Sequence, residues 1–166
     1  MDNKIISKAF LLLGSNLGDR ISNLQKAIIK IEEVCGKIVQ TSFVYETTPW
    51  GFLNQAPFLN QVVVLETIHT PNLLIHCLLD IEIEIGRIRE FKLGPRIIDI
   101  DILLFDNEII NNSILTVPHP ELPNRRFALI PLAEVGEDLI HPLLNKTIKQ
   151  ILSECIDEGH VQKFSE

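Results

Sequence analysis

The chain has 166 residues, of which 46% are hydrophobic and 22% are charged, with only 8 Gly and 9 Pro. This length predicts one domain over residues 1–166 with its own hydrophobic core, and the composition excludes disordered, collagen-like and low-complexity proteins. Acidic residues outnumber basic residues by 22 to 15, and the net charge of −7 disfavours a general nucleic-acid-binding protein.

Strands and helices alternate in the predicted secondary structure. Short apolar or alternating runs predict the strands, and apolar residues that recur every three or four positions predict the helices. The clearest helix boundaries are Thr70-Pro71, a capping hydroxyl before a proline, and Gly86 at the other end. In chain order, the predicted elements are a strand over 10–13, a helix over 24–34, strands over 38–45 and 59–65, a helix over 71–85, a strand over 97–105, and helices over 127–135 and 147–158.

The first six predicted elements follow the order β-α-β-β-α-β, which is typical of a ferredoxin-like fold. We therefore expect an α+β protein whose antiparallel sheet is covered by helices, an αβα sandwich. Two long connections join its elements, a loop containing proline and glycine over 47–57 and a basic loop over 87–96.

The cysteines and the start of the chain predict a cytoplasmic protein. Cys35, Cys77 and Cys155 are odd in number and widely spaced, which argues against a disulfide framework or a zinc site. Residues 1–8 lack a cationic start followed by a long apolar stretch, so no signal peptide is predicted. One long uncharged stretch, 47–65, contains Pro, Asn and Gln, so no membrane span is expected either.

Arginine residues indicate where an anion could bind. The two familiar phosphate-binding loops are absent, because neither a Gly-Lys-Ser/Thr ending nor a three-glycine fingerprint follows Gly14 and Gly18. Five of the six arginines, however, lie between residues 87 and 126. A guanidinium offers paired donors that match phosphate oxygens and stays charged at any working pH, although a solvated surface is the alternative interpretation.

Asp99 and Asp101 lie two residues apart in the strand predicted over 97–105. On a strand they project from the same face, about 6.6 Å apart at the backbone, and repel by roughly 2.5 kcal/mol at an effective dielectric of about 20. The flanking isoleucines predict burial, where unpaired charge is unfavourable. A hard divalent cation would resolve this conflict. The alternative is that each aspartate pairs with an arginine and only holds a loop.

Other residues give weaker signals. His119 lies in a rigid segment near Arg125, and Asn60 stands beside Leu59 in a predicted strand, which suggests a specific partner for its amide. Phe58 and Phe127 could stack on a flat ligand, or they could belong to the core.

Four segments together are more specific than any of these signals. They are LGSNLGD at 13–19, TTPWG at 47–51, GPRIIDID at 94–101, and VPHP at 117–120, which runs on to Arg125 and Phe127. With them the chain resembles the 6-hydroxymethyl-7,8-dihydropterin pyrophosphokinase family over nearly its whole length. The resemblance implies transfer of pyrophosphate from ATP to the hydroxymethyl oxygen of a reduced pterin in folate biosynthesis, with release of AMP. It also implies two magnesium ions bound with ATP and a ferredoxin-like fold. A monomer is expected.

The resemblance also implies roles for individual residues. Asp99 and Asp101 would hold the magnesium ions, and Arg87 and Arg96 would contact the phosphates and support transfer. The residues implied on the ATP side are Glu82, Arg87, Arg96, Thr116, His119 and Arg125. Those implied on the pterin side are Thr47, Thr48, Trp50, Phe58, Asn60, Asp99 and Phe127, with the two phenylalanines on either side of the ring.

The chain departs from the family at three positions. Leu93 stands directly before Gly-Pro-Arg, where an aromatic residue is frequent, and Ile114 and Leu79 replace polar residues of some members. Closure over the pterin and contacts to ATP are therefore expected to differ in detail.

Two other functions fit parts of the sequence. A nucleotidyltransferase or cyclase-like palm domain also sets paired acidic residues on a ferredoxin-like sheet, but it would normally need a basic nucleic-acid track, which the net charge of −7 disfavours. A non-catalytic ligand-binding module of the same shape would not need the pair Asp99 and Asp101.

Overall fold

A computed structural model describes residues 3–166. Met1 and Asp2, the first residues of the stretch predicted to lack a signal peptide, lie outside the described residues. The elements are β1 (Ser7–Ser15), α1 (Arg20–Val34), β2 (Lys37–Thr41), β3 (Tyr45–Thr47), β4 (Phe58–Thr67), α2 (Pro71–Ile85), β5 (Asp99–Phe105), β6 (Ile110–Asn111), β7 (Thr116–Val117), the short 3-10 helix η1 (Leu122–Asn124), α3 (Arg126–Gly136), β8 (Ile140–His141), β9 (Lys146–Thr147), α4 (Ile148–Glu154) and β10 (Val161–Lys163).

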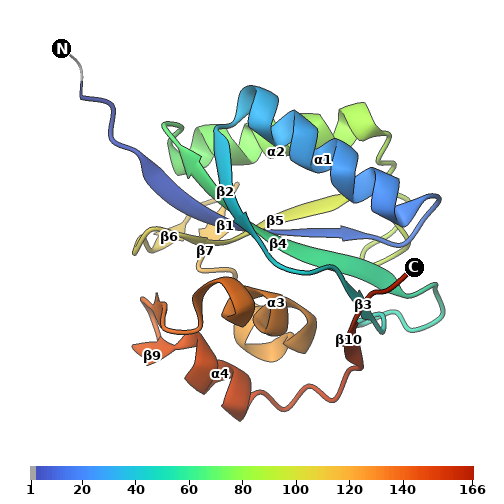
Figure 1. Cartoon of the computed structure of the whole chain (residues 1–166). Helices are drawn as coiled ribbons and strands as arrows, with labels where there is room; N and C mark the ends of the chain where they lie inside the picture. The colour runs from blue at the N-terminus through green and yellow to red at the C-terminus, as the bar shows by residue number, and fades with distance from the viewer. Residues whose placement is uncertain (1–2) are drawn as a thin grey trace.

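The main sheet is antiparallel and lies between two layers of helices. Its strand order is β10-β3-β4-β1-β5, and β2 also pairs with β4. Helices α1 and α2 cover one face, and α3 and α4 cover the other (Figure 1). This arrangement confirms the expected α+β sandwich, with β2 and β3 together in the place of the second predicted strand.

Alternation along the central strands divides the hydrophobic core between the two faces. Leu11 and Leu13 of β1 pack with α1 and α2, whereas Phe10 and Leu12 pack with α3 and α4. Both faces of the strand are therefore buried, which explains why β1 is a continuous apolar run in the sequence.

The predicted boundaries of the second helix are confirmed. The Thr70 hydroxyl accepts the N–H of Leu73, and Pro71 is the first helical residue. At the other end Gly86 adopts φ 113°, and its N–H donates to the carbonyls of Glu82 and Ile83.

Two predictions about the elements were wrong, and two hairpins were missed. The strand over 38–45 is broken after Thr41, because the N–H of Phe43 donates to the Glu134 carboxylate of α3 instead of continuing a ladder. The last helix ends at Glu154 rather than at 158, because the following chain extends toward β3 and forms β10. The hairpins β6–β7 and β8–β9 were not predicted.

None of the helices described over residues 3–166 combines the length and the apolar character that a membrane span requires.

Candidate active site

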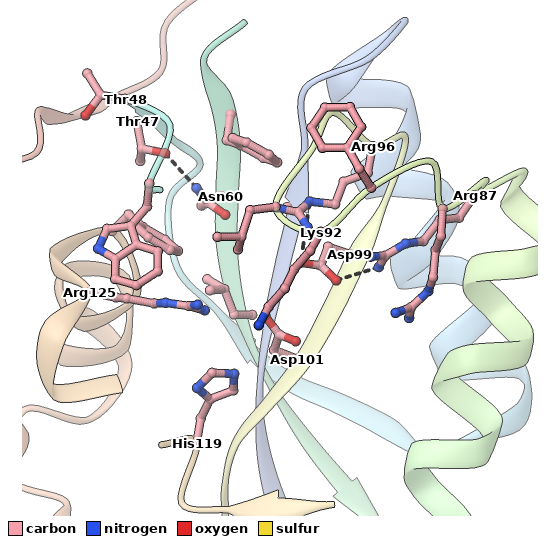
Figure 2. Close-up of a pocket in the computed structure, with 18 of the residues that line it drawn as sticks. Thr47, Thr48, Asn60, Arg87, Lys92, Arg96, Asp99, Asp101, His119 and Arg125 are labelled. Carbon is pink, nitrogen blue, oxygen red and sulfur yellow. Dashed lines mark hydrogen bonds and ion pairs between the residues drawn. The ribbon is translucent and has the colours of Figure 1, made fainter. Parts of the chain in front are cut away.

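A cavity of about 490 Å³ opens on the face of the sheet that α3 covers, beside the first turn of that helix (Figure 2). Three adjacent strands form its floor, because Gly14 of β1 pairs with Asn60 of β4 on one side and with Asp99 of β5 on the other. The predicted site residues that line this cavity are Thr47, Thr48, Trp50, Phe58, Asn60, Arg87, Arg96, Asp99, Asp101, His119, Arg125 and Phe127.

The Asn60 amide is fixed in the floor of the cavity. Its Nδ2 donates to the Thr47 hydroxyl at 2.7 Å, and Figure 2 shows its oxygen turned toward the open space. A Cβ on Gly14 would lie 2.8 Å from this oxygen, so glycine leaves the room that the amide needs. The specific partner expected for the Asn60 amide is therefore Thr47.

The two aspartates project into the cavity from the same face of β5, as their spacing predicted. Asp99 pairs with Arg87 at 2.6 Å and lies 3.7 Å from Arg96 Nε. Asp101, in contrast, takes part in no ion pair among the described residues. Burial, and next the charge of Asp99, raises the pKa of Asp101 to about 8. A cation bound beside Asp101 would favour the charged form of its carboxyl group.

The acidic pair fits magnesium that is shared with a phosphate ligand. Within residues 3–166, no group of three or more His, Cys, Asp or Glu side chains is placed to hold a metal ion by itself. Magnesium usually takes only one or two carboxylates and completes its coordination with water and phosphate oxygens. Asp99 and Asp101 supply that number of carboxylates at the cavity.

Glu82 lies behind the cavity and holds Arg87. Its Oε1 accepts a hydrogen bond from Arg87 Nη1 at 2.7 Å and one from the N–H of Ile100 at 3.1 Å, and its side chain is 3% exposed. Burial, and next the charge of Asp99, raises the pKa of Glu82 to about 7. The same Arg87 atom reaches Asp99, so one guanidinium lies between two carboxylates.

A second cavity adjoins the first between α2 and the β6–β7 hairpin. Its walls are apolar where Ile75, Leu79, Ile83 and Ile114 face it, and it shares Arg87, Arg89, Asp99 and Asp101 with the first cavity. Glu82 lines this second cavity, whereas Thr116 is exposed in β7 and lines neither. Leu79 and Ile114, two positions where a departure from the family is expected, thus form part of one apolar wall.

Three arginines place buried donors in this region without an acceptor. The Nε atoms of Arg87, Arg96 and Arg125 are buried and have no hydrogen-bond partner within the described residues. Buried polar groups are nearly always paired, so these donors indicate an anionic ligand. The guanidinium carbon of Arg96 lies 5.1 Å from the Phe58 ring centre, and that of Arg125 lies 5.7 Å from the Phe127 ring centre. The aromatic residues therefore also support the arginines.

His119 presents one N–H donor to the cavity. Its Nδ1 accepts the N–H of Glu121 at 3.1 Å, so in the neutral ring the proton lies on Nε2. Burial, and next the charge of Arg125, lowers the pKa of His119 to about 4. The ring is therefore neutral near pH 7 and can donate through Nε2.

The loops over 48–57 and 86–98 meet above the cavity. Phe52 and Phe91 stack edge to face with ring centres 5.2 Å apart, and Gln55 Nε2 donates to the Leu93 carbonyl at 2.8 Å. A Cβ on Gly51, which adopts φ 84°, would lie 2.7 Å from Leu93 Cδ1. Leu93, the third position where a departure from the family is expected, thus packs against the loop over 48–57.

Asn16 is a structural link that sequence reasoning missed. Its Nδ2 donates to Gln55 Oε1 at 2.9 Å and to the Ala56 carbonyl at 3.0 Å, while its Oδ1 accepts the N–H of Arg96 at 2.8 Å. The LGSNLGD segment drew attention to this position, but its partners lie 39 to 80 residues away in sequence. Lys92, which also lines the cavity, gave no signal beyond its charge.

Comparisons with known proteins agree with one another. Residues 10–137 match the family described as 7,8-dihydro-6-hydroxymethylpterin-pyrophosphokinase (HPPK). The chain is 46% identical over 149 residues to the 2-amino-4-hydroxy-6-hydroxymethyldihydropteridine pyrophosphokinase of Aquifex aeolicus, which covers 90% of this chain and 92% of that protein. It is 43% identical over 132 residues to the protein of the same name from Bacillus subtilis, which covers 79% of each.

A solved structure supports the fold. A crystal structure of wild-type Plasmodium falciparum HPPK-DHPS matches with a TM-score of 0.74 at 18% sequence identity, over 93% of this chain and 44% of that longer chain. At this identity the structural match concerns the fold alone, whereas the family match and the two relatives above cover most of the sequence. The chain therefore belongs to the 7,8-dihydro-6-hydroxymethylpterin-pyrophosphokinase family of folate biosynthesis.

Proposed function

We propose that this site transfers pyrophosphate from ATP to the hydroxymethyl group of 6-hydroxymethyl-7,8-dihydropterin and releases AMP. Family membership supports the reaction class. The observation that carries the assignment to this cavity is the set of three buried arginine Nε donors without an acceptor, next to two carboxylates on one face of β5. A polyphosphate with bound magnesium satisfies both groups at once.

Arg87, Arg96 and Arg125 would bind the phosphates of ATP in this proposal. Phosphoryl-type transfer depends mainly on positioning and on neutralising charge, so donors that are held rigidly before the substrate binds are effective. Arg87 is held by Glu82, and Arg96 is held through its backbone by Asn16. His119 would add a neutral donor at Nε2, with no protonation change needed near pH 7.

Asp99 and Asp101 would hold the magnesium ions, two of them with ATP. When bound there, magnesium neutralises phosphate charge and orients the oxygens for in-line attack. The two carboxyl groups lie on one face of β5 and both line the cavity, and Asp101 takes part in no ion pair among the described residues, which supports this role. Their exchange for uncharged side chains would remove the metal, while Glu82 and Asn16 would still hold Arg87 and Arg96.

The second cavity suits the nucleoside of ATP. Its apolar wall of Leu79, Ile83 and Ile114 suits a flat base, and it adjoins the arginines and aspartates of the first cavity. Glu82 then acts on the ATP side through Arg87. Thr116 lies near this region in β7 without lining the cavity, so its predicted ATP contact would require movement of the β6–β7 hairpin.

The pterin would bind between the loop that follows β3 and the first turn of α3. Phe58 and Phe127 offer flat apolar surfaces to the cavity, and Asn60 offers an amide oxygen that is turned toward the open space (Figure 2). Thr47, Thr48 and Trp50 line the same side. A neutral heterocycle needs such apolar walls with a few polar groups that fix its orientation.

The residues assigned above to ATP, magnesium and the pterin lie together in one fold. We extend the proposal to a monomer that uses residues 1–166 as a single domain. Cys35, Cys77 and Cys155 are all free thiols, which supports a reducing, cytoplasmic location.

The test is incubation of the purified protein with ATP, magnesium and 6-hydroxymethyl-7,8-dihydropterin, followed by separation of the nucleotides. AMP should form only when both the pterin and magnesium are present. Formation of ADP, or no turnover by folded protein, would contradict the proposal. A pterin product that carries a nucleotide monophosphate would instead support the palm-domain alternative.

A further inference from the structure

The segment after α4 contacts both walls of the first cavity. Residues 155–160 lie outside helices and strands, and β10 then pairs antiparallel with β3, with Val161 opposite Thr47 (Figure 1). This segment lies beyond residues 10–137, the part that matches the family. We call residues 157–164 the C-terminal clip.

On the loop side, the clip is bonded to Thr48 in both directions. The N–H of Thr48 donates to the His160 carbonyl at 3.1 Å, and the N–H of His160 donates to the Thr48 hydroxyl at 3.1 Å. The N–H of Phe164 donates to the Val44 carbonyl at 2.8 Å, beyond the other end of β3. These bonds fix the chain where it leaves β3 and enters the loop that carries Trp50.

On the helix side, Asp157 caps α3. Arg125 precedes this helix and provides no capping bond from its side chain. Instead, Asp157 Oδ2 accepts the N–H of Arg126 at 3.0 Å, and Asp157 Oδ1 accepts the N–H of Gly159 at 2.9 Å. A carboxylate near a helix N-terminus is also favoured by the helix dipole. One side chain thus joins the turn of the clip to the first turn of α3.

The two attachments come together around Arg125. Its guanidinium carbon lies 4.5 Å from the Trp50 ring centre and 5.7 Å from the Phe127 ring centre, so a residue of the loop and one of α3 flank the same cation. Between this group and the clip lies a small cavity lined by Thr48, Pro49, Trp50, Phe127, Asp157, Gly159, His160 and Val161. The clip therefore contacts the outer side of the walls whose inner side faces the first cavity.

We infer that the C-terminal clip is a positioning element of the active site, and that Asp157 is its positioning residue. The clip holds Thr48 and Trp50 against the first turn of α3 before the pterin binds. This inference rests on the proposed function, because it takes this loop as a wall of the pterin site. A loop that is already ordered loses less conformational entropy on binding, so the clip acts on pterin affinity more than on the transfer step.

The first test compares Asp157→Ala with Glu158→Ala. Glu158 is the neighbouring, exposed carboxylate and makes no hydrogen bond or ion pair among residues 3–166, so it controls for the change in charge. Asp157→Ala should raise the KM for the pterin about three- to tenfold, with kcat and the KM for ATP within about twofold of wild type. Asp157→Asn keeps one acceptor oxygen and should recover part of the loss. Glu158→Ala should behave as wild type.

The second test follows Trp50 directly and needs no turnover. Trp50 is the only tryptophan of the chain, so quenching of tryptophan fluorescence by acrylamide reports on this loop alone. Quenching should increase in Asp157→Ala and in His160→Pro, which removes the N–H that donates to Thr48. His160→Ala keeps that N–H and should match wild type.

Unchanged quenching together with an unchanged pterin KM in Asp157→Ala and His160→Pro would overturn the inference. It would also be overturned if kcat fell and the KM values for both substrates rose to the same extent while the melting temperature decreased. That combination indicates general destabilisation. If wild-type protein shows no pterin-dependent turnover, the proposed function fails, while the quenching comparison still decides whether the clip holds the loop.

Discussion

At the scale of single residues, the arginines of the site differ in what else they hold. Arg87 Nη1 donates to Glu82 and to Asp99, and its side chain is 9% exposed. Arg96 lies farther from Asp99, at 3.7 Å, and its position depends on backbone bonds to Asn16. Arg87 therefore supports the protein structure and would also bind the proposed ligand, whereas the Arg96 side chain would serve mainly that ligand.

Arg87→Ala and Arg96→Ala should therefore separate stability from catalysis. Both should lower kcat at least about tenfold, more than they weaken ATP binding, because a charge-assisted hydrogen bond contributes about 1.5–3 kcal/mol. Only Arg87→Ala should also lower the free energy of unfolding, by roughly 1–3 kcal/mol, since Glu82 then loses a buried partner. Single-turnover kinetics, ATP titration and urea denaturation measure these effects.

Arg89→Ala is the control for both variants, because the Arg89 side chain is 67% exposed and lies 3.9 Å from Glu82. It should change kcat and stability less than either. Equal losses in ATP affinity and in kcat/KM, with kcat unchanged, would mean that Arg87 and Arg96 only hold ATP.

His119 gives the stability of the protein a defined dependence on pH. Its pKa is lowered from 6.5 to about 4 in the folded protein, so the unfolded chain takes up a proton first as the pH falls. The stability that depends on neutral His119 is thus fully present above pH 6.5 and is lost progressively toward pH 4. Urea denaturation should show a steeper decline over this range for wild type than for His119→Gln. Parallel pH profiles would contradict the assignment.

At the scale of elements, the site depends on two loops that contact each other rather than on one rigid element. The loops over 48–57 and 86–98 meet through Phe52, Phe91 and the bond from Gln55 to Leu93, and Asn16 of the β1–α1 connection reaches both. The loop over 48–57 follows β3, and the loop over 86–98 precedes β5, so the sheet fixes one end of each loop. The contacts between the two loops then fix their position over the cavity.

The contact between Phe52 and Phe91 should help to hold the two loops together over the cavity. An edge-to-face aromatic pair contributes about 0.5–1.5 kcal/mol beyond its area, so Phe91→Leu should raise the KM for the pterin about two- to tenfold. A double-mutant cycle with Phe52→Leu measures the interaction, and the two effects should be clearly less than additive. Additive effects would show that the rings act independently.

At the scale of the whole molecule, an acidic protein concentrates its arginines around one site. The net charge is −7, yet Arg87, Arg89, Arg96 and Arg125 all line the first cavity together with Lys92. These cations lie beside Asp99 and Asp101, so the site carries opposite charges that magnesium and a polyphosphate would complement. Binding at such a site should stabilise the entire fold, because the ligand joins α2, β5 and the loops.

Magnesium-ATP should therefore raise the melting temperature of the wild-type protein. A ligand present at 100 times its Kd stabilises the folded state by about 2.7 kcal/mol, and removal of magnesium with EDTA should reduce this effect. Asp101→Ala should remove the magnesium-dependent part and abolish turnover. Without ligand, the variant should be at least as stable as wild type, because it loses a half-buried carboxyl group whose pKa is raised to about 8. Near-normal activity of the variant at ordinary magnesium concentrations would contradict the metal-binding role.

Local rules were sufficient for most elements of the fold and failed where distant contacts intervened. The capping residues Thr70 and Gly86 gave correct boundaries for α2, because helix caps depend on neighbouring residues. The break between β2 and β3 depends on Glu134 of α3, which is 91 residues from Phe43. The strand β10 forms because β3 offers an edge, and its own three residues carry too little pattern to predict it.

The sequence by itself determined that Asp99 and Asp101 share a face and that arginines flank them, because alternation along a strand and the order of residues are local properties. Only the tertiary structure decided which atoms meet. Asp157 reaches Arg126 across 31 residues, Gln55 meets Asn16 across 39, and His160 meets Thr48 across 112. Such contacts arise from packing of the complete chain, so neither the spacing nor the composition of any one segment indicates them.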